Sequence, residues 1–145
     1  MIALGCDGAG YELMRIIKAH LDSKDLAYMC FGADNGESSD YPIFAQNAAV
    51  AVLDGHCDRG IVICGTGIGI SIAANRFPGI RCALCHDVYS AKSTRLHNDS
   101  NMLAMGARVI GPGPACDIVD AWLDTRFSGE ERHMRRIGMI EVKNV

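Results

Sequence analysis

The sequence lacks an excess of basic residues and any apolar run long enough to cross a membrane. Its 145 residues hold 14 Lys and Arg against 17 Asp and Glu, which gives a net charge of −3. Nucleic-acid-binding domains normally carry a basic excess, so we expect no nucleic-acid partner. The longest uncharged run, Gly60–Asn75, contains four glycines and is shorter than the roughly 20 residues that span a bilayer. The first residues form no basic leader, and we therefore expect a cytoplasmic protein with no membrane partner.

Linkers, internal repeats and low-complexity segments are also missing. Domains most often hold about 100–150 residues, so a chain of this length corresponds to one domain. Hydrophobic residues make up 49% and charged residues 21% of the chain, close to the globular averages. We therefore expect residues 1–145 to form one domain with its own core.

What the sequence does contain is an alternation of short apolar runs with amphipathic stretches. The apolar runs are Ile2–Cys6, Ala27–Phe31, Gly60–Cys64, Arg81–Cys85 and part of Met102–Ile110. The helical stretches are Tyr11–Leu21, Asp40–Leu53, a segment ending at Asn75, Asp87–His97, Ala115–Leu123 and a C-terminal helix over about 130–142. Strands that are apolar on both sides are typical of a parallel sheet covered by helices on both faces. The sequence therefore predicts an α/β fold, a Rossmann-like three-layer sandwich with a five-stranded parallel sheet.

A glycine-rich segment directly follows the third predicted strand. Parallel sheets bind ligands at the carboxyl ends of their strands, and Gly65-Thr66-Gly67-Ile68-Gly69 lies at such an end. Glycines let backbone N–H groups face an anion, and the following helix N-terminus adds its dipole. The segment has neither the dinucleotide G-x-G-x-x-G spacing nor a Walker Gly-Lys-Ser/Thr. The residues alone fit either an anion cradle or a tight turn between strand and helix.

Two further features fit either a functional role or an ordinary one. Cys64 comes just before the glycine-rich segment, where it is either a core thiol or a thiolate stabilised by the helix N-terminus. Arg132 and Arg136 lie four residues apart, on one face of the predicted C-terminal helix. Such a pair suits a phosphate, but it also suits a solvated surface.

The run Cys82-Ala83-Leu84-Cys85-His86 matches the spacing of a haem attachment site. It lies in a predicted buried strand of a chain without an export signal, where the two cysteines would pack instead of react. A zinc site would need a second pair of ligands at fitting spacing, which the sequence does not offer. We therefore expect neither a haem nor a zinc site in this run.

Several segments, in order along essentially the whole chain, carry a family resemblance. They are Gly5-Cys6-Asp7, Asp40-Tyr41-Pro42, Gly60–Asn75, His97-Asn98-Asp99, Gly106-Ala107-Arg108-Val109 and Arg132-His133. They resemble the motifs of the ribose-5-phosphate isomerase B family, which includes the galactose-6-phosphate isomerase subunits. The resemblance implies an aldose–ketose isomerase for phosphorylated sugars that uses no metal or cofactor.

The resemblance also implies the catalytic roles. Cys64 would be the base that moves a proton between C1 and C2 of the sugar. Thr66 and the backbone of Gly65, Gly67 and Gly69 would stabilise the enediolate oxygen. His97 would help to open the furanose ring, with Asn98 beside it.

Substrate binding and assembly are implied in the same way. Asp7 and Tyr41 would contact the sugar hydroxyls and the ring oxygen. Arg108, Arg132 and Arg136 would hold the phosphate. In the family the tail arginines reach into the neighbouring subunit's site, so we expect a homodimer or homotetramer whose C-terminal helix is shared across subunits.

The chain departs from the family pattern at Gly8, where a histidine usually lines the sugar-phosphate pocket. We expect this change to leave more room and one hydrogen-bond donor fewer. Ribose 5-phosphate is the favoured substrate, and allose 6-phosphate and galactose 6-phosphate are alternatives.

A non-catalytic sugar-phosphate-binding paralogue is the main competing interpretation, but such a protein would need none of Cys64, Thr66 and His97. A flavodoxin-like nucleotide-binding module is disfavoured because the dinucleotide fingerprint is missing.

Overall fold

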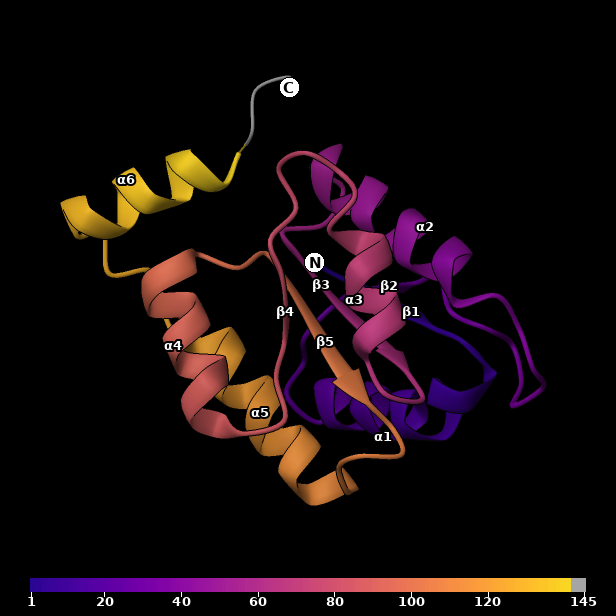
Figure 1. Cartoon of the computed structure of the whole chain (residues 1–145). Helices are drawn as coiled ribbons and strands as arrows, with labels where there is room; N and C mark the ends of the chain where they lie inside the picture. The colour runs from indigo at the N-terminus through magenta and orange to yellow at the C-terminus, as the bar shows by residue number, and fades with distance from the viewer. Residues whose placement is uncertain (142–145) are drawn as a thin grey trace.

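The structure, a computed structural model, describes residues 1–141 and contains a five-stranded parallel sheet (Figure 1). The strands are β1 (Ile2–Cys6), β2 (Tyr28–Cys30), β3 (Arg59–Cys64), β4 (Cys82–Leu84) and β5 (Met102–Gly106). Their order across the sheet is β2-β1-β3-β5-β4, and every neighbouring pair is parallel. The predicted five-stranded parallel sheet is confirmed.

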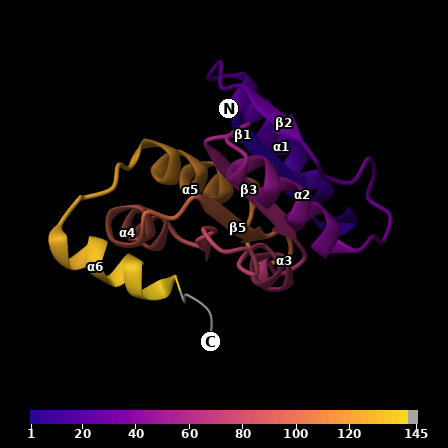
Figure 2. The same cartoon turned by 90° about the horizontal axis from the view of Figure 1, so that it is seen from above.

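Helices cover both faces of this sheet (Figures 1 and 2). They are α1 (Tyr11–Asp22), α2 (Tyr41–Leu53), α3 (Ile68–Ala74), α4 (Val88–Asn98), α5 (Pro112–Asp124) and α6 (Glu131–Ile140), and the short 3-10 helix η1 (Gly8–Gly10) precedes α1. Successive strand side chains point to opposite faces, so Leu4 packs in one core with α1 and α5 while Ala3 packs in the other with α2. The three-layer α/β arrangement is therefore confirmed as well.

The two edge strands differ from the prediction in length and burial. β2 and β4 span three residues each and are partly exposed, whereas β1 and β5 are buried throughout. An edge strand pairs on one side only, so fewer of its residues are held in the ladder. The C-terminal helix was predicted over about 130–142 and is observed as Glu131–Ile140; residue 142 lies outside the described residues. Within residues 1–141, no helix is both long and apolar enough to cross a membrane.

One buried hydrogen bond ties α5 to the loop before β5. Trp122 is fully buried, and its indole Nε1 donates to the Ser100 hydroxyl at 2.8 Å. Arg59 lies over the indole ring, with its guanidinium carbon 5.4 Å from the ring centroid. The indole therefore supplies both packing and the partner of a buried hydroxyl.

Replacing Trp122 with phenylalanine keeps an aromatic ring but leaves the Ser100 hydroxyl without its donor. We expect the free energy of unfolding to fall by about 1–3 kcal/mol, the usual cost of an unpaired buried polar group. Urea unfolding of the wild type and of W122F measures this difference. An unchanged midpoint would show that the hydrogen bond contributes nothing to stability.

Candidate active site

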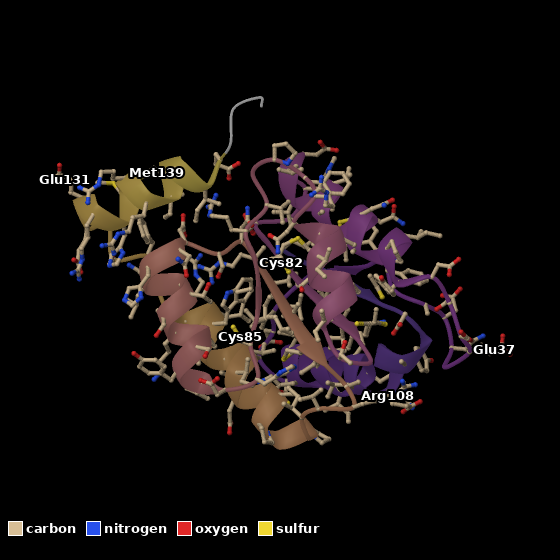
Figure 3. The ribbon with its side chains drawn as sticks, in the orientation of Figure 1. Glu37, Cys82, Cys85, Arg108, Glu131 and Met139 are labelled. Atoms are coloured by element: carbon tan, nitrogen blue, oxygen red, sulfur yellow. The ribbon has the colours of Figure 1, made fainter. Side chains whose placement is uncertain are left out.

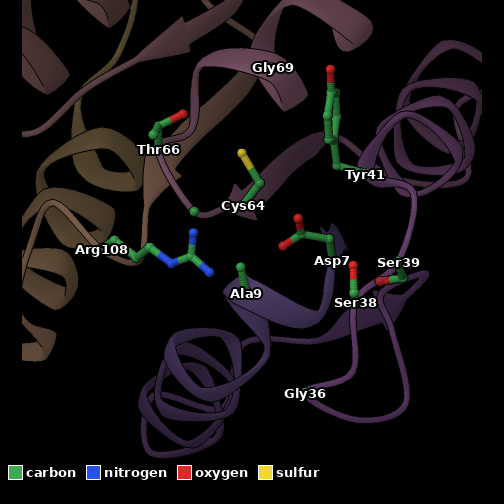
Figure 4. Close-up of a pocket in the computed structure, with 11 residues that line it drawn as sticks. Asp7, Ala9, Gly36, Ser38, Ser39, Tyr41, Cys64, Thr66, Gly69 and Arg108 are labelled. Atoms are coloured by element: carbon green, nitrogen blue, oxygen red, sulfur yellow. The ribbon is translucent and has the colours of Figure 1, made fainter.

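A cleft of about 440 Å³ opens at the carboxyl ends of β1 and β3, where the fold class places its ligands. Its lining residues are Asp7, Ala9, Gly36, Ser38, Ser39, Tyr41, Cys64, Gly65, Thr66, Gly69 and Arg108 (Figure 4). Asp7, Tyr41, Cys64 and Arg108 come from four separate parts of the chain. The parallel sheet therefore gathers most of the site residues predicted from the sequence into one cavity.

Cys64 ends β3 and lies at the start of the glycine-rich turn. Its side chain is only 5% exposed, and its sulfur accepts a hydrogen bond from the Gly67 N–H at 3.2 Å. Gly67 has a φ of +77°, and a Cβ there would lie 2.7 Å from the Met105 carbonyl carbon. Only glycine fits this backbone, which folds the turn over the sulfur. An N–H donor so placed stabilises negative charge on Cys64.

The same turn fixes Thr66 and Arg108 at the rim of the cleft. The Thr66 hydroxyl is exposed and accepts from the Ile68 N–H at 3.2 Å. The backbone N–H of Arg108 donates to the Gly65 carbonyl at 2.9 Å, which attaches the segment after β5 to the turn. The guanidinium of Arg108 points into the cleft from the side opposite Asp7 (Figure 4).

Asp7 and Tyr41 form the other side of the cleft. Asp7 follows β1, and one carboxylate oxygen accepts from the Gly10 N–H at 2.9 Å, which caps η1. This bond holds the carboxylate in a fixed direction, toward the middle of the cleft (Figure 4). Tyr41 begins α2, and its ring lies against Gly69. The two side chains thus offer an acceptor and a phenol hydroxyl on one wall.

Four other predicted site residues lie elsewhere in the molecule. Within residues 1–141, none of His97, Asn98, Arg132 and Arg136 lines the cleft that holds Cys64. A helix that links two parallel strands runs antiparallel to them. The C-terminal end of α4 therefore lies near the amino ends of the strands, whereas Cys64 lies at their carboxyl ends. Helix α6 packs beside α4 (Figures 1 and 2). One chain therefore contains two separated groups of predicted site residues.

His97 is stacked on a second histidine, His133 of α6. The two ring centroids are 4.6 Å apart and the planes are inclined by 20°. His133 is buried, and its Nε2 has no hydrogen-bond partner among residues 1–141. Burial, followed by the charges of His97 and Arg132, lowers the pKa of His133 below its usual value. The buried His133 ring thus packs against one face of the His97 ring.

The expectation that Gly8 leaves more room in the cleft is wrong. A Cβ on Gly8 would lie 1.7 Å from the Glu37 carbonyl oxygen, because the 36–39 loop packs directly on this glycine. The space of a side chain at position 8 is therefore filled by backbone from another part of the chain. The sequence contains no sign of this contact, which joins residues about 30 positions apart.

Sequence reasoning also missed Ser38 and Ser39 of the cleft, as well as the hydrogen bond that His86 accepts at the end of β5. The two serines lie in a polar loop without periodicity, yet both line the cleft. His86 belongs to no motif except the rejected haem pattern, and its Nε2 accepts from the Gly106 N–H at 3.0 Å at the end of β5. Burial raises the pKa of Cys85, in the same run, to about 11, so that thiol stays protonated. No three His, Cys, Asp or Glu side chains gather as a metal site within residues 1–141.

Comparison with known proteins gives one consistent result. The model of the Ribose/Galactose Isomerase family matches residues 2–140. The chain is 48% identical to ribose-5-phosphate isomerase B of Escherichia coli, over 96% of this chain and 93% of that protein. It is 46% identical to D-erythrulose-4-phosphate isomerase of Pectobacterium atrosepticum, over 88% and 85%. The solved structure of Clostridium thermocellum ribose-5-phosphate isomerase B has a TM-score of 0.94 and 51% identity, with 97% of this chain and 94% of that chain covered.

Proposed function

Since the chain belongs to the ribose/galactose isomerase family and is an aldose–ketose isomerase of sugar phosphates, we propose that it interconverts ribose 5-phosphate and ribulose 5-phosphate. The proposed base is Cys64. The observation that carries this assignment is the sulfur at the head of the glycine-rich turn, with an N–H donor at 3.2 Å and the cleft in front of it. The name of the Escherichia coli relative supports the choice of sugar.

The proposed reaction transfers one proton. The Cys64 thiolate removes the proton from C2 of the open-chain aldose, a double bond forms between C1 and C2, and the C1 oxygen takes the negative charge. The C2 hydroxyl then passes its proton to the C1 oxygen, and the Cys64 thiol gives its proton to C1 as C2 becomes the carbonyl, which leaves the ketose and restores the thiolate. A positioned acid–base group typically contributes about 10²–10⁴-fold.

The glycine-rich turn supplies what the enediolate needs. Its charge develops on oxygen, so hydrogen-bond donors already in place beside the base lower the barrier. The Thr66 hydroxyl and the backbone of Gly65 and Gly69 line the same end of the cleft as Cys64, while the Gly67 N–H donates to the sulfur itself. Asp7 and Tyr41 orient the sugar hydroxyls, and Arg108 holds the phosphate.

We propose that a second copy of the chain completes each site. His97, Asn98, Arg132 and Arg136 lie far from the Cys64 cleft of their own chain, and a two-fold dimer would bring them to the cleft of its partner. Large apolar side chains are exposed beside both groups: Ile72 of α3 is 60% exposed and Met139 of α6 is 74% exposed. Such side chains are typical of surfaces that a partner covers. A homotetramer would pair two such dimers.

Replacing Arg136 with alanine should raise KM and weaken the inhibition by inorganic phosphate. Because a hydrogen bond to a charged group typically contributes about 1.5–3 kcal/mol, we expect phosphate-dependent affinity to fall about 10- to 100-fold, which appears mainly as a higher KM. Arg135→Ala is the matched control, because Arg135 is an exposed arginine of the same helix that points about 100° around the helix axis from Arg136. An unchanged KM in R136A would remove Arg136 from the phosphate clamp.

A turnover panel tests the proposed substrate. The purified protein is assayed with ribose 5-phosphate, allose 6-phosphate, galactose 6-phosphate and D-erythrulose 4-phosphate. We expect the highest kcat/KM for ribose 5-phosphate. A higher value for another sugar would replace the substrate and keep the reaction. Binding of these sugars without turnover of any would instead indicate a non-catalytic paralogue.

A further inference from the structure

The 36–39 loop is held on the cleft from both ends. The Ala33 N–H donates to the Cys6 carbonyl at 2.8 Å, which joins the start of the loop segment to the end of β1. At the other end, the Gly8 N–H donates to the Ser39 hydroxyl at 3.0 Å. The loop is therefore attached to the same strand end that supplies Asp7.

Gly8 is the residue that permits this approach. Its φ is not in the left-handed region, so backbone conformation does not demand a glycine here. The requirement comes from space: an added Cβ would lie 1.7 Å from the Glu37 oxygen and 3.0 Å from a Gly36 backbone carbon. Backbone atoms at such distances cannot rotate away as a side chain can, so any larger residue displaces the loop.

The seated loop forms one wall of the cleft. Gly36, Ser38 and Ser39 line it on the side across from Arg108, with Ala9 between them (Figure 4). The Ser39 hydroxyl is engaged by Gly8, whereas the exposed Ser38 hydroxyl points into the cleft. The Glu37 side chain points outward at the tip of the loop (Figure 3). Ser38 is thus the side chain of this loop best placed to contact a ligand.

We propose that the Gly36–Ser39 loop, which can pack this closely only because residue 8 is glycine, determines how many carbons a sugar phosphate may have to fit the cleft. Ser38 hydrogen-bonds the phosphate-bearing end of the sugar, opposite Arg108. The reacting carbons are fixed at Cys64, so this wall sets the number of carbons between Cys64 and the phosphate. The seated loop favours a five-carbon sugar over a six-carbon one. The inference rests on the proposed function and adds a determinant of chain length to it.

The test compares wild type, G8A, S38A and E37A on ribose 5-phosphate and on allose 6-phosphate, which has one carbon more. We expect S38A to raise KM for ribose 5-phosphate about 2- to 12-fold with kcat nearly unchanged, the effect of one lost hydrogen bond. We expect G8A to displace the loop, raise this KM about tenfold and increase the allose-to-ribose ratio of kcat/KM at least about fivefold. E37A, whose side chain lies outside the cleft, should match the wild type.

Dissociation constants of both sugar phosphates, measured by calorimetry on the same variants, keep the inference separate from the proposed function. Wild-type turnover of ribose 5-phosphate tests the function, while the change in preference between the sugars tests the loop. If the wild type binds but does not turn over these sugars, the same shift in their relative affinity in G8A still supports the loop assignment. An unchanged preference in G8A, or wild-type KM and affinity in S38A, would overturn it.

Discussion

Replacing Cys64 with alanine will lower kcat on ribose 5-phosphate by at least about a hundredfold, because a positioned base contributes 10²–10⁴-fold. KM should stay near the wild-type value. The side chain is only 5% exposed at the bottom of the cleft, so it adds little to ground-state binding. An interaction made only in the transition state changes kcat and leaves KM. Steady-state kinetics and calorimetric binding of ribose 5-phosphate measure the two quantities separately.

Cys30→Ala is the matched control for this experiment. Cys30 is an exposed thiol on the edge strand β2 and does not line the cleft. Its loss should leave kcat and KM unchanged, which excludes a general effect of removing a thiol. If C64A retained more than about a hundredth of wild-type kcat, the base would be another group.

Replacing His97 with alanine will also lower turnover, by about 10²-fold, if this residue opens the furanose ring as an acid–base group. The structure adds a second prediction, that His97 acts in the site of the partner chain, because it lies at the end of the sheet opposite to its own Cys64. A mixture of C64A and H97A chains should therefore recover activity. Each mixed dimer contains one site with both groups intact, so random reassortment restores about a quarter of the wild-type activity.

The mixing experiment uses co-expression of two differently tagged chains followed by isolation of the mixed dimers. One of the two sites in each isolated mixed dimer is intact, so the isolated species should show about half of the wild-type activity. The control mixes C64A with a second Cys64 variant, C64S, which leaves every site without the thiol. Recovery in the first mixture alone places His97 and Cys64 of one site on different chains. No recovery in either mixture, with mixed dimers isolated, would contradict the shared site.

Much of the fold could be predicted because local pattern and topology agree. Runs such as Ile61–Cys64 are apolar on both sides, and the stretches between the runs have helical spacing, which leaves a covered parallel sheet as the consistent solution. The lengths of β2 and β4 could not be predicted in the same way. Their partial exposure follows from their place at the sheet edges, and strand order is not visible in the local pattern.

The site residues, too, could be predicted from the sequence only where local pattern or topology places them. Cys64 and the glycine-rich turn are contiguous in sequence, so their proximity follows from a single strand end. The position of His97 also follows from topology, since the end of a crossover helix lies opposite the strand ends that bind ligand. The packing of the 36–39 loop on Gly8 depends on an irregular segment that has no periodic signal. The effect of Gly8 on the cleft could therefore be found only in three dimensions.

The proton transfer between C1 and C2 is tested most directly by running the reaction in deuterium oxide and following the product by NMR. In a fraction of turnovers, the proton that the Cys64 thiol has taken from C2 exchanges with solvent while the enediolate is still bound. We predict that ribose 5-phosphate is converted to ribulose 5-phosphate with deuterium accumulating at C1 over many turnovers, and that C64A abolishes both conversion and exchange. Ketose formed with all its C1 hydrogen retained from the substrate, or formed equally well by C64A, would contradict an enediolate reaction with Cys64 as the base.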